Sequence, residues 1–281
     1  MSRMRRVLAL AVAAAACSST PKSGADSRPV PAEIREQEKG LAIERGAERF
    51  TDTRPPPRPS DADLKEFDRV WALYRAQSPR WPDERARYQR RNEACAYVLS
   101  MFLLAHYHRV NLDRAGHAAE LRRVCDEIVA VGSPCAPFLV DWMILDEIRV
   151  PSLEKKTEGK AFLTDDITRQ DCLVMLGRMG AQATPDLLRA LGRKDLGPKA
   201  RRHLALALGA TRDPLAFEPL LRLLREDESW QVRGDAAQAL GDLGDRRALP
   251  ALRDAATRDA DPHVRKRAGR AIEWLQGRAR R

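Results

Sequence analysis

TRQDCLVMLGRMGAQATPDLLRAL, which begins at Thr168, is the first of four similar segments in the second half of the chain. At intervals of 32 residues it is followed by ARRHLALALGATRDPLAFEPLLRL from Ala200, VRGDAAQALGDLGDRRALPALRDA from Val232 and VRKRAGRAIEWLQGRARR from Val264. A fixed period of this length, with one supersecondary unit per copy, is typical of a stacked solenoid. The sequence therefore predicts repeated units over residues 167–281.

The first half of each copy has the pattern of a helix. Small and aliphatic residues recur at i, i+4, i+5 and i+8, which places them on one helical face. In chain order these are Thr168, Cys172, Leu173, Leu176, Ala200, Leu204, Ala205, Leu208, Val232, Ala236, Ala237, Leu240, Val264, Ala268, Gly269 and Ile272. Small residues allow neighbouring helices to approach closely, as a stack of like units requires.

A glycine column and a leucine column complete each predicted hairpin. Gly177, Gly209 and Gly241 follow the apolar face, where we expect a left-handed cap or a tight turn to end the first helix. A second helix then opens and carries Leu188, Leu220 and Leu252 in one column and Leu191, Leu223 and Ala255 three residues later. Each unit is therefore predicted to be a helix hairpin.

One polar column is the same in all four copies. Its members are Arg169, Arg201, Arg233 and Arg265. Six residues before the last three arginines stand Asp195, Asp227 and Asp259. The pattern favours a structural ladder, in which each arginine holds loop carbonyls or a carboxylate of its own or the adjacent unit. The alternative is a row of arginines that binds phosphate or another acidic ligand, with side chains spaced about 10 Å apart by the packed helices.

The segment from Asp227 to Leu252 carries a family pattern, D-x-x-x-x-V-R-x-x-A-A-x-A-L-G-x-L-G-D-x-x-A-L-P-A-L. It resembles the HEAT-like repeats first grouped with the phycobilisome lyases, and the neighbouring copies are looser versions. The resemblance implies an all-α, right-handed α-solenoid of helix hairpins with an N-terminal helical cap. It implies little about activity, because this superfamily includes bilin lyases, a di-iron hydroxylase, base-excision DNA glycosylases and plain scaffolds.

Residues 1–17, MSRMRRVLALAVAAAAC, have the layout of a bacterial secretory signal, with arginines before a short apolar run. Residues 14–17 resemble a lipobox, which predicts a diacylated Cys17 as the mature N-terminus. The alternative is ordinary cleavage, because Ala14 and Ala16 also satisfy the small-x-small rule. We expect an exported protein of the cell envelope, anchored to a membrane on its periplasmic or outer face.

Residues 18–60 are rich in Ser, Pro, Gly and charged residues and are predicted to form a disordered tether.

Residues 61–150 are expected to be helical, with helices from about Ala62, from Pro82 to Arg109 and from Leu112 to Val131. Residues 112–148 are interpreted as a divergent hairpin. The apolar residues 94–105 are too few to span a membrane and indicate a core helix. Residues 151–166 form an inserted loop, which either contacts a partner or is simply solvated.

The formal net charge is +10. A basic solenoid could bind nucleic acid, but most of its arginines are interleaved with acids, and an exported protein meets anionic lipid or cell-wall polymers instead. The densest basic patch consists of Arg265, Lys266, Arg267, Arg270, Arg278, Arg280 and Arg281.

Two tryptophans are candidate contact residues. Trp230 is predicted to be a contact residue or an inter-repeat packing ring, and Trp274 to cap the stack or form an oligomer contact.

Nothing in the sequence nominates a catalytic site. Five scattered histidines lack a following glutamate, His106 and His108 are interpreted as a surface pair, and no GxSxG, Walker, HExxH or dinucleotide motif is present. Cys95, Cys125, Cys135 and Cys172 lack a CxxC spacing; Cys125 and Cys135 either form a disulfide or remain thiols.

We therefore expect no metal, no cofactor and no enzymatic activity. The predicted function is a non-catalytic protein-interaction scaffold with an unidentified protein partner. A bilin-lyase-like accessory enzyme and a basic nucleic-acid-binding solenoid are the alternatives.

Overall fold

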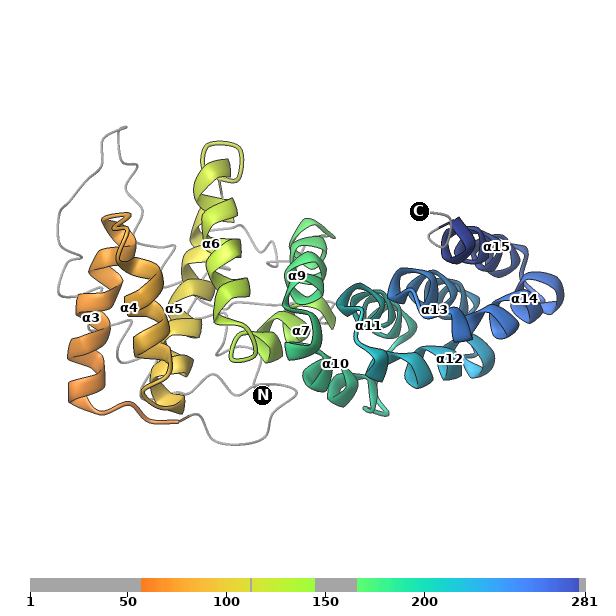
Figure 1. Cartoon of the computed structure of the whole chain (residues 1–281), viewed down its shortest axis with the longest axis horizontal. Coiled ribbons are helices and arrows are strands. Elements are labelled where there is room, and N and C mark those ends of the chain that lie inside the picture. Colours follow the sequence, from red (N-terminus) through yellow and green to blue (C-terminus); the bar gives the residue numbers. More distant parts are fainter. Residues whose placement is uncertain (1–56, 112, 145–165, 278–281) are drawn as a thin grey trace, which may run out of the picture. The chain divides into compact units, whose positions relative to one another are not determined.

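The computed structural model describes residues 57–111, 113–144 and 166–277. This part of the chain contains twelve α-helices and three short 3-10 helices and no strand, which confirms the predicted all-α class (Figure 1). It divides into two compact units. The first contains α3 to α6, and the second contains α7 and α9 to α15. The handedness of the solenoid and the capping role of the N-terminal helices stay predictions.

Several sequence-based predictions lie outside the described residues. They are the signal peptide with Cys17, almost the whole tether, residues 145–150, the inserted loop up to residue 165, and Arg278, Arg280 and Arg281 of the basic patch.

The first unit begins with a capped helix. The Ser60 hydroxyl accepts a hydrogen bond from the Asp63 amide at 3.2 Å, and the Asp63 carboxylate accepts one from the Ser60 amide at 3.1 Å. This capping box starts α3 (Asp61–Arg75) where the sequence indicates. Phe67 and Val70 of this helix are buried, each at most 2% exposed.

The single helix predicted from Pro82 to Arg109 is wrong. The chain instead forms α4 (Trp81–Gln89) and α5 (Glu93–Asn111), separated by residues 90–92. Asn92 explains the break, because its side-chain oxygen accepts a hydrogen bond from the Cys95 amide at 2.8 Å and so starts a new helix. α6 (Ala118–Val131) begins later than predicted and ends at Gly132, whose φ is 77°.

The apolar centre of α5 is part of the core, with Val98, Leu99 and Leu103 fully buried. Among the described residues, no single helix is both long and apolar enough to cross a membrane. α6 and α7 (Ala136–Ile144) pass that test only when taken together, across the break at residues 132–135.

The second unit is a stack of hairpins in two rows (Figure 1). We call the first helices of the hairpins the first-helix row: α9 (Asp166–Met179), α11 (Pro198–Thr211), α13 (Trp230–Leu243) and α15 (Pro262–Gly277). The second-helix row consists of α10 (Thr184–Leu191), α12 (Phe217–Glu226) and α14 (Leu249–Arg258). The predicted apolar face lies between units, since Ala205, Ala237 and Leu240 are fully buried.

The glycine column does not end the first helices, contrary to prediction. Gly177, Gly209 and Gly241 lie inside α9, α11 and α13, where the next helix of the row leaves no room for a side chain. A Cβ atom on Gly209 would lie 2.6 Å from the Ala239 backbone, and one on Gly241 would lie 3.0 Å from the Ala271 Cβ. The fourth position of this column is Glu273.

The chain reverses three residues after each glycine of that column. Gly180, Arg212 and Gly244 all have positive φ angles, of 61°, 54° and 84°. Arg212 and Gly244 are the left-handed C-caps of α11 and α13. The glycines of the column therefore serve helix packing, and the residues three positions later serve the turn.

The two rows are packed to different degrees. α11, α13 and α15 contact one another along their lengths, whereas α12 and α14 touch at few residues. A stack whose rows differ in spacing is curved, and the closely packed row lies on the inside of the curve. The first-helix row therefore forms the concave side of the second unit.

Candidate interaction surface

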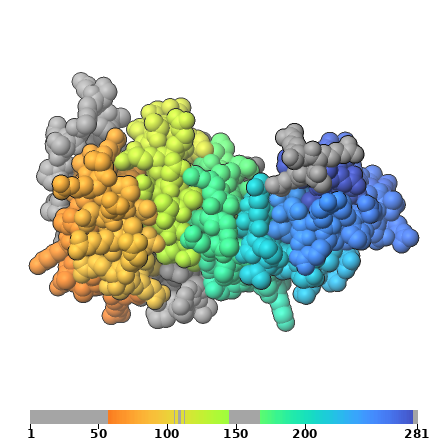
Figure 2. Space-filling model, viewed as in Figure 1, coloured from red at the N-terminus to blue at the C-terminus, as the bar shows by residue number. Residues whose placement is uncertain are grey.

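Positive charge is concentrated on the first-helix row. Its four helices carry ten Lys and Arg residues against five Asp and Glu residues. The second-helix row carries five against four. The helices of this unit pack against one another (Figure 2), and neighbouring helices of the first-helix row are in direct contact.

Arg201 and Arg233 each join two successive units. Arg201 donates from Nε and Nη2 to the two carboxylate oxygens of Asp227, at 2.7 and 3.0 Å, and from Nη1 to the Leu196 carbonyl at 2.8 Å. Arg233 repeats this arrangement on Asp259, at 2.8 and 3.0 Å, and on the Asp227 carbonyl. Each guanidinium therefore fixes its own loop and the carboxylate of the following unit in a two-bond fork.

The arrangement changes at the two ends of the column. Asp195 does not take a ladder arginine; it is exposed and pairs with Arg193. Arg169 is buried. Arg265 donates from Nη1 to the carbonyls of Asp259 and Ala260, at 2.7 and 3.0 Å.

The basic patch predicted at residues 265–270 separates into residues with different surroundings. Arg265 holds a loop, and Arg267 binds the carboxylate of Asp235, which is 2% exposed. Lys266 and Arg270 are exposed and make no ion pair among the described residues. Their charged groups are therefore not committed to an internal ion pair within that part of the chain.

Asp235 is shared between two arginines. Arg202 donates to it from Nε at 2.6 Å, and Arg267 donates to its other oxygen from Nη1. The side chain of Arg267 passes over Gly234 to reach Asp235. A Cβ atom on Gly234 would lie 3.1 Å from the Arg267 Cδ. Burial and the nearby charges of Arg202 and Arg270 lower the pKa of Arg267.

The two tryptophans predicted to be contact residues are both accessible. Trp230 is 36% exposed at the start of α13 and stacks on His263 at the start of α15, with ring centroids 5.1 Å apart. It therefore bridges neighbouring units and also faces solvent. Trp274 is 53% exposed near the end of α15.

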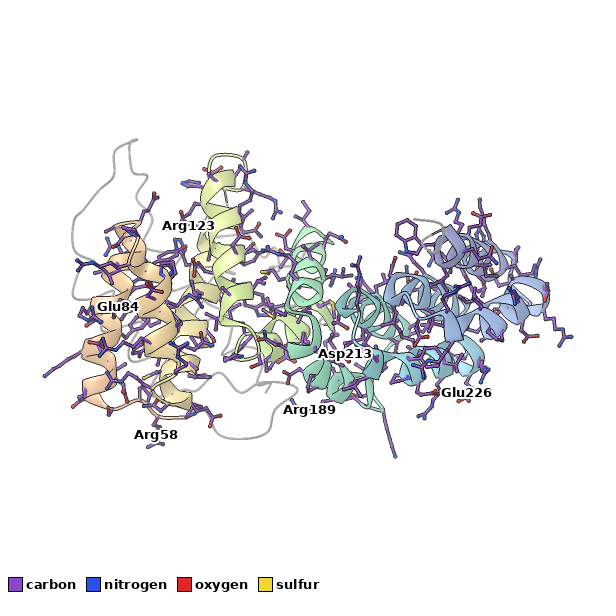
Figure 3. The ribbon with its side chains drawn as sticks, viewed as in Figure 1. Arg58, Glu84, Arg123, Arg189, Asp213 and Glu226 are labelled. Carbon is purple, nitrogen blue, oxygen red and sulfur yellow. The ribbon has the colours of Figure 1, made fainter. Side chains whose placement is uncertain are left out.

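His106 is not the surface residue that the sequence suggests. Its side chain is 9% exposed, and its Nε2 lies 2.7 Å from Glu120 Oε1. Glu120 also accepts hydrogen bonds from the Tyr74 hydroxyl at 3.0 Å and from Arg123 at 2.8 and 2.9 Å. Arg123, on α6, is labelled in Figure 3. The rings of Trp71 and Tyr74 pack against His106. They form no recognisable sequence motif, so the burial of His106 could not be predicted from the sequence.

Replacing Glu120 by glutamine tests this cluster. Burial alone would raise the pKa of Glu120, but hydrogen bonds from His106 and Arg123 lower it to about 2. A carboxylate whose folded pKa lies below its unfolded value stabilises the fold above the unfolded pKa, near 4.5, and this stabilisation is lost as the pH falls towards 2. We expect E120Q to lower the free energy of unfolding by about 1 kcal/mol at pH 7 and by less at pH 3, where part of the stabilisation is already lost.

Urea unfolding followed by tryptophan fluorescence measures this effect, because Trp71 and Trp81 lie against Tyr74. E93Q, at an exposed position in the first turn of α5, is the matched control, with a change of about 0.5 kcal/mol or less. An equal loss for E120Q at pH 3 and pH 7 would contradict the assignment.

The described residues offer no other chemical centre. They contain no group of three or more His, Cys, Asp or Glu side chains that could hold a metal ion. Cys125 and Cys135, like Cys95 and Cys172, are not in disulfides.

The repeats agree with a known family. Residues 161–240 and 217–280 match the family model for HEAT repeats. The repeat region is HEAT-like. A 76-residue segment is 33% identical to a Geobacillus stearothermophilus protein described as an uncharacterized protein in the gldA 3' region. That segment covers 27% of this chain and 35% of the relative, so the chain spans about a third of that protein's length.

A solved structure also matches over most of the chain. It is human deoxyhypusine hydroxylase in complex with glycerol, with a TM-score of 0.37, 15% identity, and coverage of 98% of this chain and 97% of that chain. The prediction that the chain is not an enzyme is contradicted by this comparison, because the matching protein is itself an enzyme. At this identity and TM-score, the likeness assigns no activity to the chain.

Proposed function

We propose that this chain is a protein-binding scaffold of the bacterial cell envelope, and that the exposed side of the first-helix row is its docking surface. The observation that carries the proposal is the charge distribution of the repeats. Basic residues gather on the concave row, while the second-helix row is nearly balanced. Concave rows of helical repeats offer a long surface on which binding is spread over many contacts.

The proposed location rests on residues 1–60. An export signal ending in Cys17, followed by a Pro- and Ser-rich segment, supports a lipid anchor with a tether that sets the distance from the membrane. Growth with labelled palmitate tests the anchor: the label should follow the chain into the membrane fraction and be lost in C17S. An unlabelled chain would contradict the lipid anchor.

The docking surface is tested by cross-linking in cells. A photo-activated cross-linker placed at Arg270 should capture a discrete protein, because this side chain is exposed on the concave row. The same cross-linker at Arg222, exposed on α12 in the second-helix row, is the matched control and should capture little. Equal capture from both positions, or capture of nucleic acid from Arg270, would contradict the proposed surface.

A further inference from the structure

Two kinds of arginine lie on the concave row, and they differ in how fully their nitrogens are used. In Arg201 and Arg233, all three side-chain nitrogens donate hydrogen bonds to carboxylates or carbonyls. In Arg202 only Nε donates, and in Arg267 only Nη1 donates. The remaining nitrogens of these two arginines have no hydrogen-bond partner within residues 57–111, 113–144 and 166–277.

The side chains that carry the unused nitrogens are partly exposed. The side chains of Arg202 and Arg267 are 38% and 33% exposed, whereas the Asp235 carboxylate that holds them is 3% exposed. The buried carboxylate of Asp235 therefore holds two partly exposed guanidinium groups in place. Arg267 lies against Gly234, where a Cβ atom would lie 3.1 Å from its Cδ and 3.6 Å from its Nη1.

The local charge is not balanced. One carboxylate faces two guanidinium groups, and the exposed Arg270 is close enough to lower the pKa of Arg267, together with burial and Arg202. An added anion would reduce the repulsion among these three arginines. Arg201 and Arg233 have no such excess, since each has its own aspartate.

The two unused nitrogens of Arg267, Nε and Nη2, indicate which kind of anion would bind there. Arg201 and Arg233 bind their aspartates with Nε and Nη2, and this same pair of nitrogens is unused in Arg267. A planar carboxylate fits this edge with two parallel hydrogen bonds. In both Arg201 and Arg233, the group bound to this pair of nitrogens is a carboxylate.

We propose that Arg202 and Arg267, held by Asp235, form a receptor for an aspartate or glutamate side chain of the protein partner. The partner's carboxylate accepts two hydrogen bonds from Nε and Nη2 of Arg267, while Arg202 and Arg270 supply further positive charge. This inference rests on the proposed function and specifies the chemistry of its partner: an acidic segment.

Binding of a fluorescent hexa-aspartate peptide to the whole chain tests the receptor, with hexa-asparagine as the neutral control. We expect R267K to weaken peptide binding by about 10-fold although it keeps the charge, because an ammonium group cannot form the fork. We expect R270E to weaken binding by about fivefold, and the matched reversal R222E on α12 to change it less than about twofold. Circular dichroism and a thermal melt establish that the variants are folded.

Three results would overturn the inference. They are unchanged peptide binding by R267K, equal binding of hexa-asparagine and hexa-aspartate, and tighter binding of duplex DNA or phosphatidylglycerol vesicles than of hexa-aspartate at the same salt concentration.

Failure of the receptor is distinguishable from failure of the proposed function. If the cross-linker at Arg270 captures a protein in cells and the R267K variant captures it equally, the surface stands and the receptor does not. If peptide binding follows the expected order and no protein is captured, the receptor stands and the proposed function does not.

Discussion

Replacing Gly209 by alanine is expected to lower the free energy of unfolding by about 3 kcal/mol. The added methyl group would lie 2.6 Å from both the Cα and the carbonyl oxygen of Ala239. These are backbone atoms, so no side-chain rotation relieves the contact, and α11 and α13 must separate. The higher helix propensity of alanine, about 1 kcal/mol, offsets only part of this cost.

Gly269 provides the matched control for this substitution. It also lies inside a helix of the first-helix row, but a Cβ atom there would have no neighbour within 4 Å. G269A should therefore raise the free energy of unfolding by about 0.5 to 1 kcal/mol. Urea unfolding followed by circular dichroism at 222 nm measures both variants. If G209A is as stable as the parent, close packing of the first-helix row is not what holds the stack.

Replacing Arg233 by lysine is expected to lower the free energy of unfolding by about 2 kcal/mol. Lysine keeps the charge but cannot bind both oxygens of Asp259 and the loop carbonyl at once. The Asp259 carboxylate is 9% exposed, so water does not replace the lost hydrogen bonds fully. R258K, in an ion pair whose side chains are 82% and 64% exposed, should cost about 0.5 kcal/mol or less.

The cost of R233K should depend on pH with a defined sign. Hydrogen bonds from Arg233, against the opposing effect of burial, lower the pKa of Asp259. The pair therefore stabilises the fold above the ordinary range of an aspartate, near pH 4, and this stabilisation is lost as the pH falls through the lowered pKa. Urea unfolding at pH 7 and pH 3 should show a smaller difference between R233K and the parent at the lower pH. A constant difference would mean that the loop carbonyls, and not Asp259, account for the effect.

The sequence predicted the helices of the second half because the period repeats their whole pattern. Ala205 and Ala237 occupy one column, and both are buried between units as that column implies. The glycine column was misinterpreted for a physical reason: glycine serves both for positive φ and for close contact, and a pattern does not separate the two. Only the positions of Arg212 and Gly244 show that the turn comes three residues later.

The first half of the chain was harder to predict, because it has no repeats to compare. The break before α5 depends on one asparagine, and the burial of His106 depends on Glu120, which lies on another helix. The candidate receptor was missed for a related reason. Arg202 and Arg267 belong to different columns of the repeat, and they meet only because Arg267 crosses Gly234 to reach Asp235.

The glycine column also has a geometric consequence. The distance between successive helices on the inner row is limited by a position with no side chain, whereas α12 and α14 of the outer row touch at few residues. Exchanging one of these glycines for a slightly larger residue, with compensating changes in the helix it touches, would widen the arc. Evolution could thereby adjust the radius of the solenoid to ligands of different girth without altering any residue that the ligand touches.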